Sequence, residues 1–456
     1  MNRISKVGLA SLLVAKLLLA GRAWAEGSLS LAQLRDLALS RSSALHTALL
    51  STDEAALAEK RLSQELLPSF EASAASGASL AQGGSLLPSV SASISASQLI
   101  WDGGRYGVEA AIDALTTKGA RASARSALLA AEADVDSAYY AVLEAEAGIE
   151  AASQDLAAAK DRLALAQART DAGIASRVDL LSAQSEAATA QTSLVQARRD
   201  SSIARARLAS LTGIDPGASL SELDGAKVES LATRLAALDA AAIQALADRL
   251  VGLSQASNPD MAAARFASEA AARQVDLAKS DGLPSLSAQA SQSLDWNPAT
   301  GNLSSTPSVG LQASLAIAPW TVASSIKSAA IEAQKASLAS EQSARTVELD
   351  LRESLFNLIA DAEAVGSDKL ALDYAEESYS AVLESYKRSA ASVSSLSDAA
   401  ASVGASRKAL IEAHYGLLQE LSSLSALVGD EGATFAGSLG EELGPGGKLL
   451  LQDLLP

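Results

Sequence analysis

"SVSASISASQLIWDGGR", residues 89–105, changes its period halfway along and indicates a β-strand joined directly to a helix. In its first half Val90, Ala92 and Ile94 alternate with serines, and a period of two residues is typical of a strand. After the glycine pair a helical pattern continues to about residue 171, a length of ~100 Å at ~1.5 Å per residue. The stretch therefore predicts a strand hairpin that leads into a helix several times longer than a membrane is thick.

Both elements occur twice in the chain, at a constant offset. "LPSF" at 67–70 recurs as "LPSL" at 283–286, and "LTG" at 211–213 recurs as "LVG" at 427–429, so the members of each pair are 216 residues apart. A long internal repeat determines the architecture before any local assignment is made. Each repeat is expected to contain a helix, two strands, a long helix, a tight turn and a return helix.

The offset also sets the expected boundaries. Residues 214–257 carry short helical patterns and are expected to form a connecting equatorial segment, and the glycine-rich tail 430–456 is expected to be flexible. The first repeat covers 26–213, with a hairpin at about 68–101, a long helix at about 105–171 and a return helix at about 177–212. The second repeat covers 258–429, with a hairpin at about 284–320, a long helix at about 321–388 and a return helix at about 394–428.

Large apolar residues recur every seven positions in the expected helices. A sustained seven-residue repeat favours a left-handed supercoil. Two arrangements fit it: an antiparallel coiled coil of a filament or adhesin, and a closed cylinder in which each helix contacts two neighbours. Periodicity alone leaves both open. The series are Val135, Val142, Ile149, Leu156 and Leu163; Leu351, Leu358, Val365, Leu372 and Tyr379; and Leu396, Val403, Leu410, Leu417 and Leu424.

The composition excludes several classes of protein. The 456 residues include no cysteine and only 2 histidines, so a cysteine- or histidine-ligated metal is not expected. A formal charge of −17 argues against a nucleic-acid partner. Aromatic residues make up only 3%, which suits helices packed through small side chains better than a compact globular core. The sequence has no nucleophile motif, phosphate loop or metal spacing, so we expect neither an enzyme nor a cofactor.

Residues 1–25 are typical of a secretory signal peptide. Arg3 and Lys6 precede an apolar run, and "AWA" at 23–25 is a cleavage site of small residues. A membrane anchor is the alternative. However, Lys16 interrupts the run, which is shorter than the ~20 residues of a spanning helix. The mature chain is therefore expected to begin near Glu26.

The strand pairs indicate how the chain reaches a membrane. Four strands cannot close a barrel, and open sheet edges in lipid leave backbone groups unpaired, so other copies of the chain must complete the sheet. Trp101, Trp296 and Trp320 lie at expected strand ends, where an interfacial aromatic girdle belongs. The simpler explanation is the general preference of sheets for aromatic residues. Glu71 and Asp295 are expected near the lipid face, which argues against its burial in a membrane.

The whole mature sequence resembles the TolC-like outer-membrane efflux protein family. The resemblance rests on "SLSLAQLRDLALSRSSAL" at 28–45, the two "LPS" strand starts, "QLIWDGGR" at 98–105 and, most specifically, "DAGIASRVDLLSAQSEAATAQTSLVQARRDSSIARARLASLTG" at 171–213. It implies a mainly α fold with a membrane β-barrel, in which a homotrimer forms a twelve-stranded outer-membrane barrel and a twelve-helix periplasmic α-barrel. It also implies an exit duct for a tripartite efflux pump or a type I secretion system. The partners would be a periplasmic adaptor protein and an inner-membrane pump of RND or ABC type.

By this resemblance, the narrow periplasmic end lies beside the helix–helix turns. Asp179 and Asp398 match acidic positions there, where threefold symmetry makes rings of three charges. Tyr386 matches an aromatic residue that holds the closed state. For Asp179 the alternative role is a helix-terminal acid that complements the helix dipole. For Tyr386 it is core packing, because Tyr386 continues the heptad series.

The second repeat departs from the family pattern at its turn. The counterpart of Gly173 is Ser389, so this turn is expected to differ in shape from the first. Two further gating positions fall on Ala391 and Ser395, where the family pattern has arginine and aspartate. The hydrogen-bonded lock is therefore expected to be thinner than usual. The adaptor is expected to dock at the turns around Gly173 and Ser389.

Two other functions compete with the duct. A trimeric surface or periplasmic coiled-coil protein without a pore would show the same heptads, would behave as soluble and would not need its strands for trimerisation. A self-contained diffusion porin would need the strands but has no use for long helices. Both differ from a duct in a bilayer conductance measurement.

Overall fold

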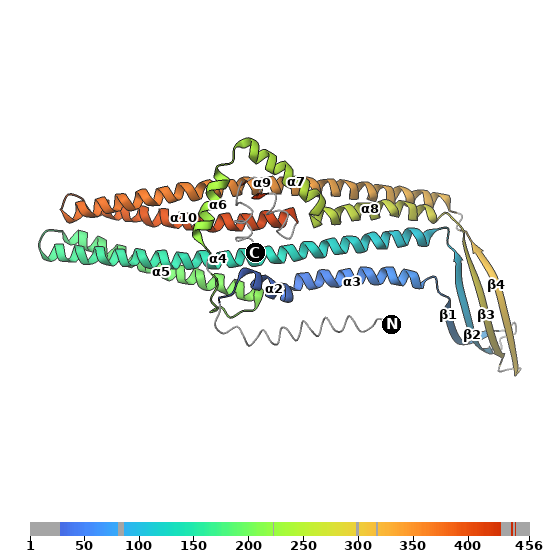
Figure 1. Cartoon of the computed structure of the whole chain (residues 1–456). Coiled ribbons are helices and arrows are strands. Elements are labelled where there is room, and N and C mark those ends of the chain that lie inside the picture. Colours follow the sequence, from blue (N-terminus) through green and yellow to red (C-terminus); the bar gives the residue numbers. More distant parts are fainter. Residues whose placement is uncertain are drawn as a thin grey trace. The chain divides into compact units, whose positions relative to one another are not determined.

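The computed structural model describes residues 28–80, 86–221, 223–297, 301–315, 318–429, 439–440 and 443. The expected signal peptide, 1–25, and nearly all of the expected tail, 430–456, lie outside the described residues. The order of helices and strands along the chain can be followed in Figure 1. The elements are α2 (Leu31–Arg41), α3 (Ser43–Gln64), β1 (Ser69–Leu80), β2 (Leu86–Trp101), α4 (Arg105–Asp171), α5 (Arg177–Thr212), α6 (Gly225–Ala236), α7 (Ala240–Ser257), α8 (Pro259–Ser280), β3 (Ser285–Asn297), β4 (Asn302–Ser314), α9 (Pro319–Lys387) and α10 (Val393–Val428).

The sequence repeat is a structural repeat, because the same caps bound the return helices. Ser176 is the N-cap of α5 and Ser392 is the N-cap of α10, and each side chain accepts a hydrogen bond from the backbone three residues on. Gly213 and Gly429 close the same two helices in the left-handed conformation. The prediction of a mainly helical chain with two tandem repeats and strand hairpins is thereby confirmed.

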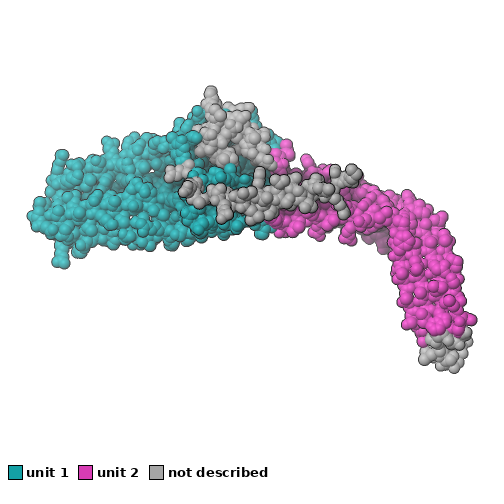
Figure 2. Space-filling view, turned by 60° about the horizontal axis from the view of Figure 1, so that its bottom comes forward, with its two compact units in different colours: residues 1–43, 128–254, 349–456 teal, residues 44–127, 255–348 magenta. Residues whose placement is uncertain are grey.

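The compact units of the fold are not the two repeats. One unit comprises residues 1–43, 128–254 and 349–456, and the other comprises 44–127 and 255–348 (Figure 2). Both contain parts of both repeats, and their boundary falls inside α4 and α9. We call them unit 1 and unit 2.

Unit 2 contains an antiparallel sheet in the order β1-β2-β3-β4. Directly paired residues share a face of a sheet, so the register assigns every strand residue to one of two faces. The polar face is rich in serine, and Ser73–Ser93, Ser285–Ser314 and Ser291–Ser308 are hydrogen-bonded pairs on it. The other face is predominantly apolar and includes Phe70, Ala72, Ala74, Val90, Ala92, Ile94, Ala96, Leu286, Ala288, Ala290, Leu294, Trp296, Leu303, Val309, Leu311 and Ala313.

Two acidic residues expected near the apolar face lie on the polar one. Glu71 pairs with Ser95, and Asp295 pairs with Ser91 and Ser304, all on the serine side. The expectation was wrong because a position along the strand does not fix the face, whereas the pairing register does. The apolar face is therefore free of both carboxylates.

The second hairpin is shorter than expected. Strand β4 ends at Ser314, and Trp320 is the second residue of helix α9 rather than a strand-end residue. Proline at the first helical position explains the difference, because Pro319 has no N–H for a sheet ladder and its fixed φ suits a helix start.

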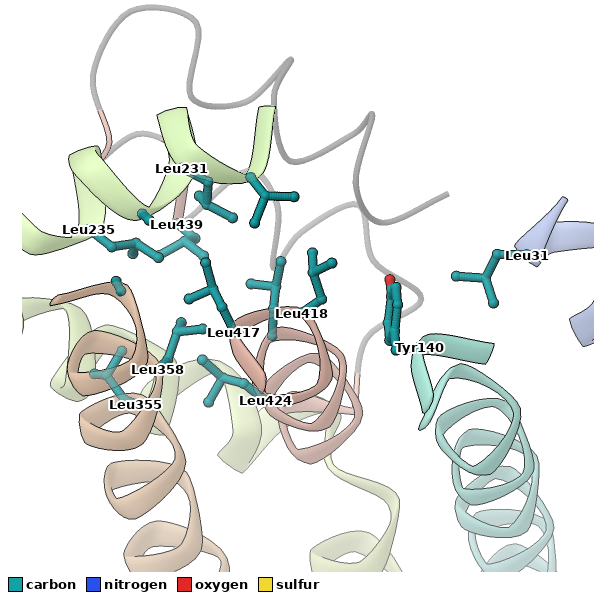
Figure 3. Packing of buried hydrophobic residues seen from close by; sticks show 14 of the residues in the cluster. Leu31, Tyr140, Leu231, Leu235, Leu355, Leu358, Leu417, Leu418, Leu424 and Leu439 are labelled. Atoms are coloured by element: carbon teal, nitrogen blue, oxygen red, sulfur yellow. The ribbon is translucent and has the colours of Figure 1, made fainter. Parts of the chain in front are cut away.

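Unit 1 carries the apolar core of the described residues (Figure 3). Heptad positions of α4 and α9, including Val142, Leu351 and Leu358, are fully buried in it. Helices α6 and α7 add Leu231, Leu235, Leu246 and Leu250, so the connecting segment packs onto the coiled-coil helices. Among the residues that the structure describes, no helix combines the length and the apolar character needed to cross a bilayer.

Candidate functional site

The candidate site is the pair of turns that join α4 to α5 and α9 to α10, both in unit 1 (Figure 1). In the first turn Gly173 has φ +72° and donates its N–H to the carbonyl of Thr170 at 2.9 Å. Ile174 donates to the carbonyl of Arg169 at 2.8 Å. These two bonds form the Schellman motif, which satisfies the last carbonyls of α4.

The second turn has the same shape, contrary to expectation. Ser389 donates to Tyr386 at 2.9 Å and Ala390 donates to Ser385 at 2.8 Å, which reproduces the first turn's pattern at an offset of 216. Ser389 has φ +61° and is the only non-glycine residue with positive φ in the part of the chain that the structure describes. The serine therefore occupies a conformation that normally favours glycine, so a compensating contact is to be sought.

That contact is a residue that the sequence analysis missed. The guanidinium of Arg169, in the last turn of α4, lies 4.4 Å from the centre of the Tyr386 ring. It donates to the Tyr386 carbonyl and, at 2.9 Å, to the Ser389 hydroxyl. The only sequence signal was an arginine in a final helical turn, which by itself indicates no more than dipole compensation.

Tyr386 is buried, at 3% exposure, so the core-packing role expected as its alternative is realised geometrically. Its hydroxyl oxygen is also buried and has no hydrogen-bond partner among the described residues. Burial raises the pKa of the Tyr386 phenol, Arg169 opposes this, and the carboxylates of Asp179 and Glu186 raise that pKa further. Asp179 and Tyr386 thus act on one another electrostatically.

Asp179 forms a capping box at the start of α5. Its carboxylate accepts from the Ser176 N–H at 3.0 Å, while its own N–H donates to the Ser176 hydroxyl at 3.2 Å. Its counterpart, Ser395, occupies the same helical position in α10 and lies 2.9 Å from the Ser392 hydroxyl. Asp398 is exposed, and within the described residues it forms no hydrogen bond or ion pair with Asp179 or Tyr386. Ala391 is half-buried beside the second turn.

A cavity of about 760 Å³ lies behind the turns, between α4, α5, α9 and α10. Small residues such as Ser182, Ala400 and Gly404 line much of it. Its charged groups are paired: Arg407 binds Asp155 at 2.9 Å and Glu376 at 3.0 Å. Arg162 lies 3.5 Å from Glu186. Burial raises the pKa of Asp155, and Arg407 opposes that shift.

The apolar face of the sheet in unit 2 is the second candidate surface. Val309 is 88% exposed, and Phe70, Ile94 and Leu311 are exposed as well. Trp101 pairs with Leu286 near the start of β3, whereas Trp296 lies at the other end of that strand and pairs with Val90. Both tryptophans are about half exposed, so they border the apolar band from opposite ends.

The described residues contain no group of histidine, cysteine, aspartate or glutamate side chains suited to a metal ion. Charged side chains at the turns instead pair with each other or with backbone groups. This arrangement is typical of contacts that hold helices together.

The chain was compared with known proteins. The model of the family described as "Outer membrane efflux protein" matches residues 34–214 and 250–430, one segment in each repeat. VceC from Vibrio cholerae is 17% identical, with a TM-score of 0.73 over 88% of this chain and 96% of that one. The CmeC outer membrane channel of Campylobacter jejuni is 16% identical, with a TM-score of 0.72 over 91% and 89%. The MtrE outer membrane channel of Neisseria gonorrhoeae is 20% identical, with a TM-score of 0.68 over 88% and 88%.

At these identities the likeness to solved structures establishes the fold. No curated protein matches the chain by sequence. The two segments of the family match correspond to the two structural repeats.

Proposed function

Because this chain belongs to the outer membrane efflux protein family, we propose that it is the outer-membrane exit duct of a tripartite efflux pump or a type I secretion system. The duct is a passive conduit with a gated periplasmic end. An inner-membrane pump supplies the energy, and a periplasmic adaptor joins pump to duct.

The observation that carries the proposal is the two-faced sheet. Leu286, the partner of Trp101, and Trp296 lie ten residues apart on β3, which corresponds to ~34 Å along the strand at ~3.4 Å per residue. A tilt of ~40° reduces this to ~26 Å, close to the ~25 Å apolar band of outer-membrane barrels. An exposed apolar face of this height, bordered by tryptophans, fits a lipid bilayer.

The sheet edges support assembly from several copies. Within the described residues β1 and β4 each pair on one side only, so the outer edge of each strand has unpaired backbone groups. In hydrocarbon each such group costs several kcal/mol, so a lone copy is unstable there. Three copies joined edge to edge close a barrel of twelve strands and leave no edge, which supports the homotrimer.

The helices distinguish the duct from its competitors. Helix α4 has 67 residues and α9 has 69, each ~100 Å long at ~1.5 Å per residue. A diffusion porin has no need for such helices. A pore-free coiled coil has no need for an exposed apolar sheet face bordered by Trp101 and Trp296. A duct that crosses the outer membrane and the periplasm uses both.

We place the gate at the helix turns. Threefold symmetry would turn Asp179 and Asp398 into two rings of three carboxylates, which attract cations and repel anions. Tyr386 would hold the closed state by its packing against the second turn. The periplasmic adaptor would dock on the helix surfaces beside Gly173 and Ser389, where small residues permit close approach of other helices.

The test is conductance in planar bilayers with the chain purified in detergent. We expect a trimer that forms cation-preferring pores, blocked by multivalent cations from the periplasmic side. The double variant Asp179→Asn, Asp398→Asn should weaken this block, because it removes six charges from the trimer while asparagine can still accept the capping hydrogen bond.

The matched control is Asp161→Asn with Asp373→Asn, which removes the same number of charges from exposed positions on α4 and α9. Unchanged block in the first double variant would remove both aspartates from the gate. A folded, monodisperse monomer without conductance would overturn the proposed function itself.

A further inference from the structure

The contacts between α4 and the α9–α10 pair change in character toward the turns. The apolar core of unit 1 extends along α9 as far as Val365 and along α4 as far as Leu143. Beyond these points three polar residues of α4, Asp155, Arg162 and Arg169, contact α9 or α10 at a spacing of seven residues. The helices are therefore joined by apolar packing far from the turns and by polar contacts near them.

The first two of these contacts lie inside the helices. Arg407 of α10 donates to Asp155 at 2.9 Å and to Glu376 of α9 at 3.0 Å. Arg162 lies 5.8 Å from the centre of the Tyr379 ring and 3.3 Å from its hydroxyl. Both link the α4 side of the unit to the α9–α10 side.

The third contact is the one nearest the turns, and it is the most complete. Arg169 stacks on the Tyr386 ring and donates to both the Tyr386 carbonyl and the Ser389 hydroxyl. It thereby binds the last turn of α9 and the residue with positive φ that follows it. One side chain of α4 stabilises both the end of α9 and the geometry of the second turn.

Polar contacts can separate more easily than apolar ones. When an arginine leaves its partners, water hydrates both, whereas separation of an apolar seam exposes surface that water does not favour. A bundle joined in this way separates first at its polar end. Here that end is the pair of turns.

We propose that Arg169 is the latch that holds the turns of each copy together and keeps the periplasmic end of the duct closed. The inference rests on the proposed function, and it names the residue that regulates it. The cation comes from α4, while Ala391 and Ser395 on the other side are uncharged. The Tyr386 ring receives the cation, and its hydroxyl, which lacks a partner among the described residues, has no part in the latch.

The experiment records single-channel currents of the purified full chain in planar bilayers. Arg169→Ala should raise the ratio of open to closed time on the order of tenfold or more, because a stacked cation and two charge-assisted hydrogen bonds are lost. Arg169→Lys should recover part of the closure, since lysine keeps the charge but not the planar fork. Tyr386→Leu should open the channel, whereas Tyr386→Phe should match the wild type.

The controls separate a latch from a general loss of structure. Arg177→Ala removes the same charge from an exposed position just after the first turn and should leave the open-to-closed ratio unchanged. The chain has no cysteine, so Arg169→Cys with Ser389→Cys provides a single pair of thiols. A bifunctional maleimide that bridges this pair should restore the closed level. Closure recovered by the bridge shows that opening came from the lost tie.

Three results would overturn the latch while leaving the duct intact. They are a wild-type open-to-closed ratio in Arg169→Ala, a wild-type channel that is fully open at rest, and opening by Tyr386→Phe as large as that by Tyr386→Leu. Failure of the wild-type chain to conduct at all would instead count against the proposed function.

Discussion

At the scale of single residues, the strongest structural contact described is a buried ion pair in unit 1. Asp136 of α4 is 2% exposed, and Arg35 of α2 binds both of its oxygens at 2.7 Å. The hydroxyl of Ser422, in α10, donates to the same carboxylate. One side chain thus joins three helices that are distant in sequence.

Removal of this carboxylate should be costly. Asp136→Ala leaves the partly buried Arg35 without its partner, and such losses cost about 3–5 kcal/mol of unfolding free energy. We expect a correspondingly lower midpoint in chemical denaturation of the detergent-solubilised protein.

The double variant Arg35→Met, Asp136→Leu should recover much of the loss, because apolar replacements of a buried ion pair are often neutral. A single Asp136→Ala variant as stable as the wild type would show that the pair does not join the helices.

Residue-scale contacts were also where the sequence was least informative. Arg169, Arg162 and Arg407 are ordinary cations on long helices, and no local pattern names their partners. Their partners come from helices more than 200 residues away, in the pairs Arg169–Tyr386, Arg162–Tyr379 and Arg407–Asp155. Asp179 was predictable in one of its roles, because Ser-x-x-Asp before an apolar helix is a local capping signal.

At the scale of elements, helices α9 and α10 meet around a carboxylate without a cation. Asp361 of α9 is half-buried, and its Oδ2 atom would lie 3.7 Å from a side chain placed on Gly416 of α10. Burial raises the pKa of Asp361 above its ordinary value of 3.8. The ionised form therefore destabilises the fold at neutral pH, since burial disfavours the charge.

We expect Asp361→Asn to raise the melting temperature slightly at pH 7.5. The sign follows from linkage: the native state binds a proton more tightly than the unfolded state, so the wild type gains stability as pH falls through the raised pKa toward 3.8. The advantage of the variant should shrink accordingly. Thermal unfolding at pH 7.5 and pH 4.5 measures both, with Asp373→Asn, at an exposed position of α9, as the control. An advantage independent of pH would show that the charge is not its cause.

The elements also show which local signals the sequence carries reliably. Alternation predicted the strands, and heptads predicted the long helices to within a few residues. The end of the second hairpin was misplaced because Trp320 was taken as a strand-end marker, although Pro319 is a stronger signal for a helix start. The shape of the second turn was misjudged because Ser389 adopts its left-handed conformation with the help of Arg169, a tertiary contact.

At the scale of the whole chain, the repeat was visible in the sequence but the compact units were not. An offset of 216 residues identifies equivalent elements, because each repeat spells the same caps and heptads. Unit 1 and unit 2 instead group the elements by contact, and each draws on both repeats. Neither repeat buries its own core, since the apolar cluster of unit 1 needs α4 from the first repeat together with α9 and α10 from the second.

The assignment of the two sheet faces makes the last prediction, which concerns insertion of the whole molecule into the membrane. Val309 lies near the middle of the apolar face, paired with Ala290, and Ser308 precedes it on the polar face. Val309→Arg should cost about 2–4 kcal/mol per copy at the bilayer midplane, so the trimer should fail to assemble in membranes. Ser308→Arg, one residue away, should assemble and shift the pore toward anions, because its charge faces the lumen. Heat-modifiable gel mobility of membrane fractions reports assembly, and bilayer reversal potentials report selectivity. Equal assembly of the two variants would contradict the placement of the apolar face in lipid, since only a lipid-facing position distinguishes them.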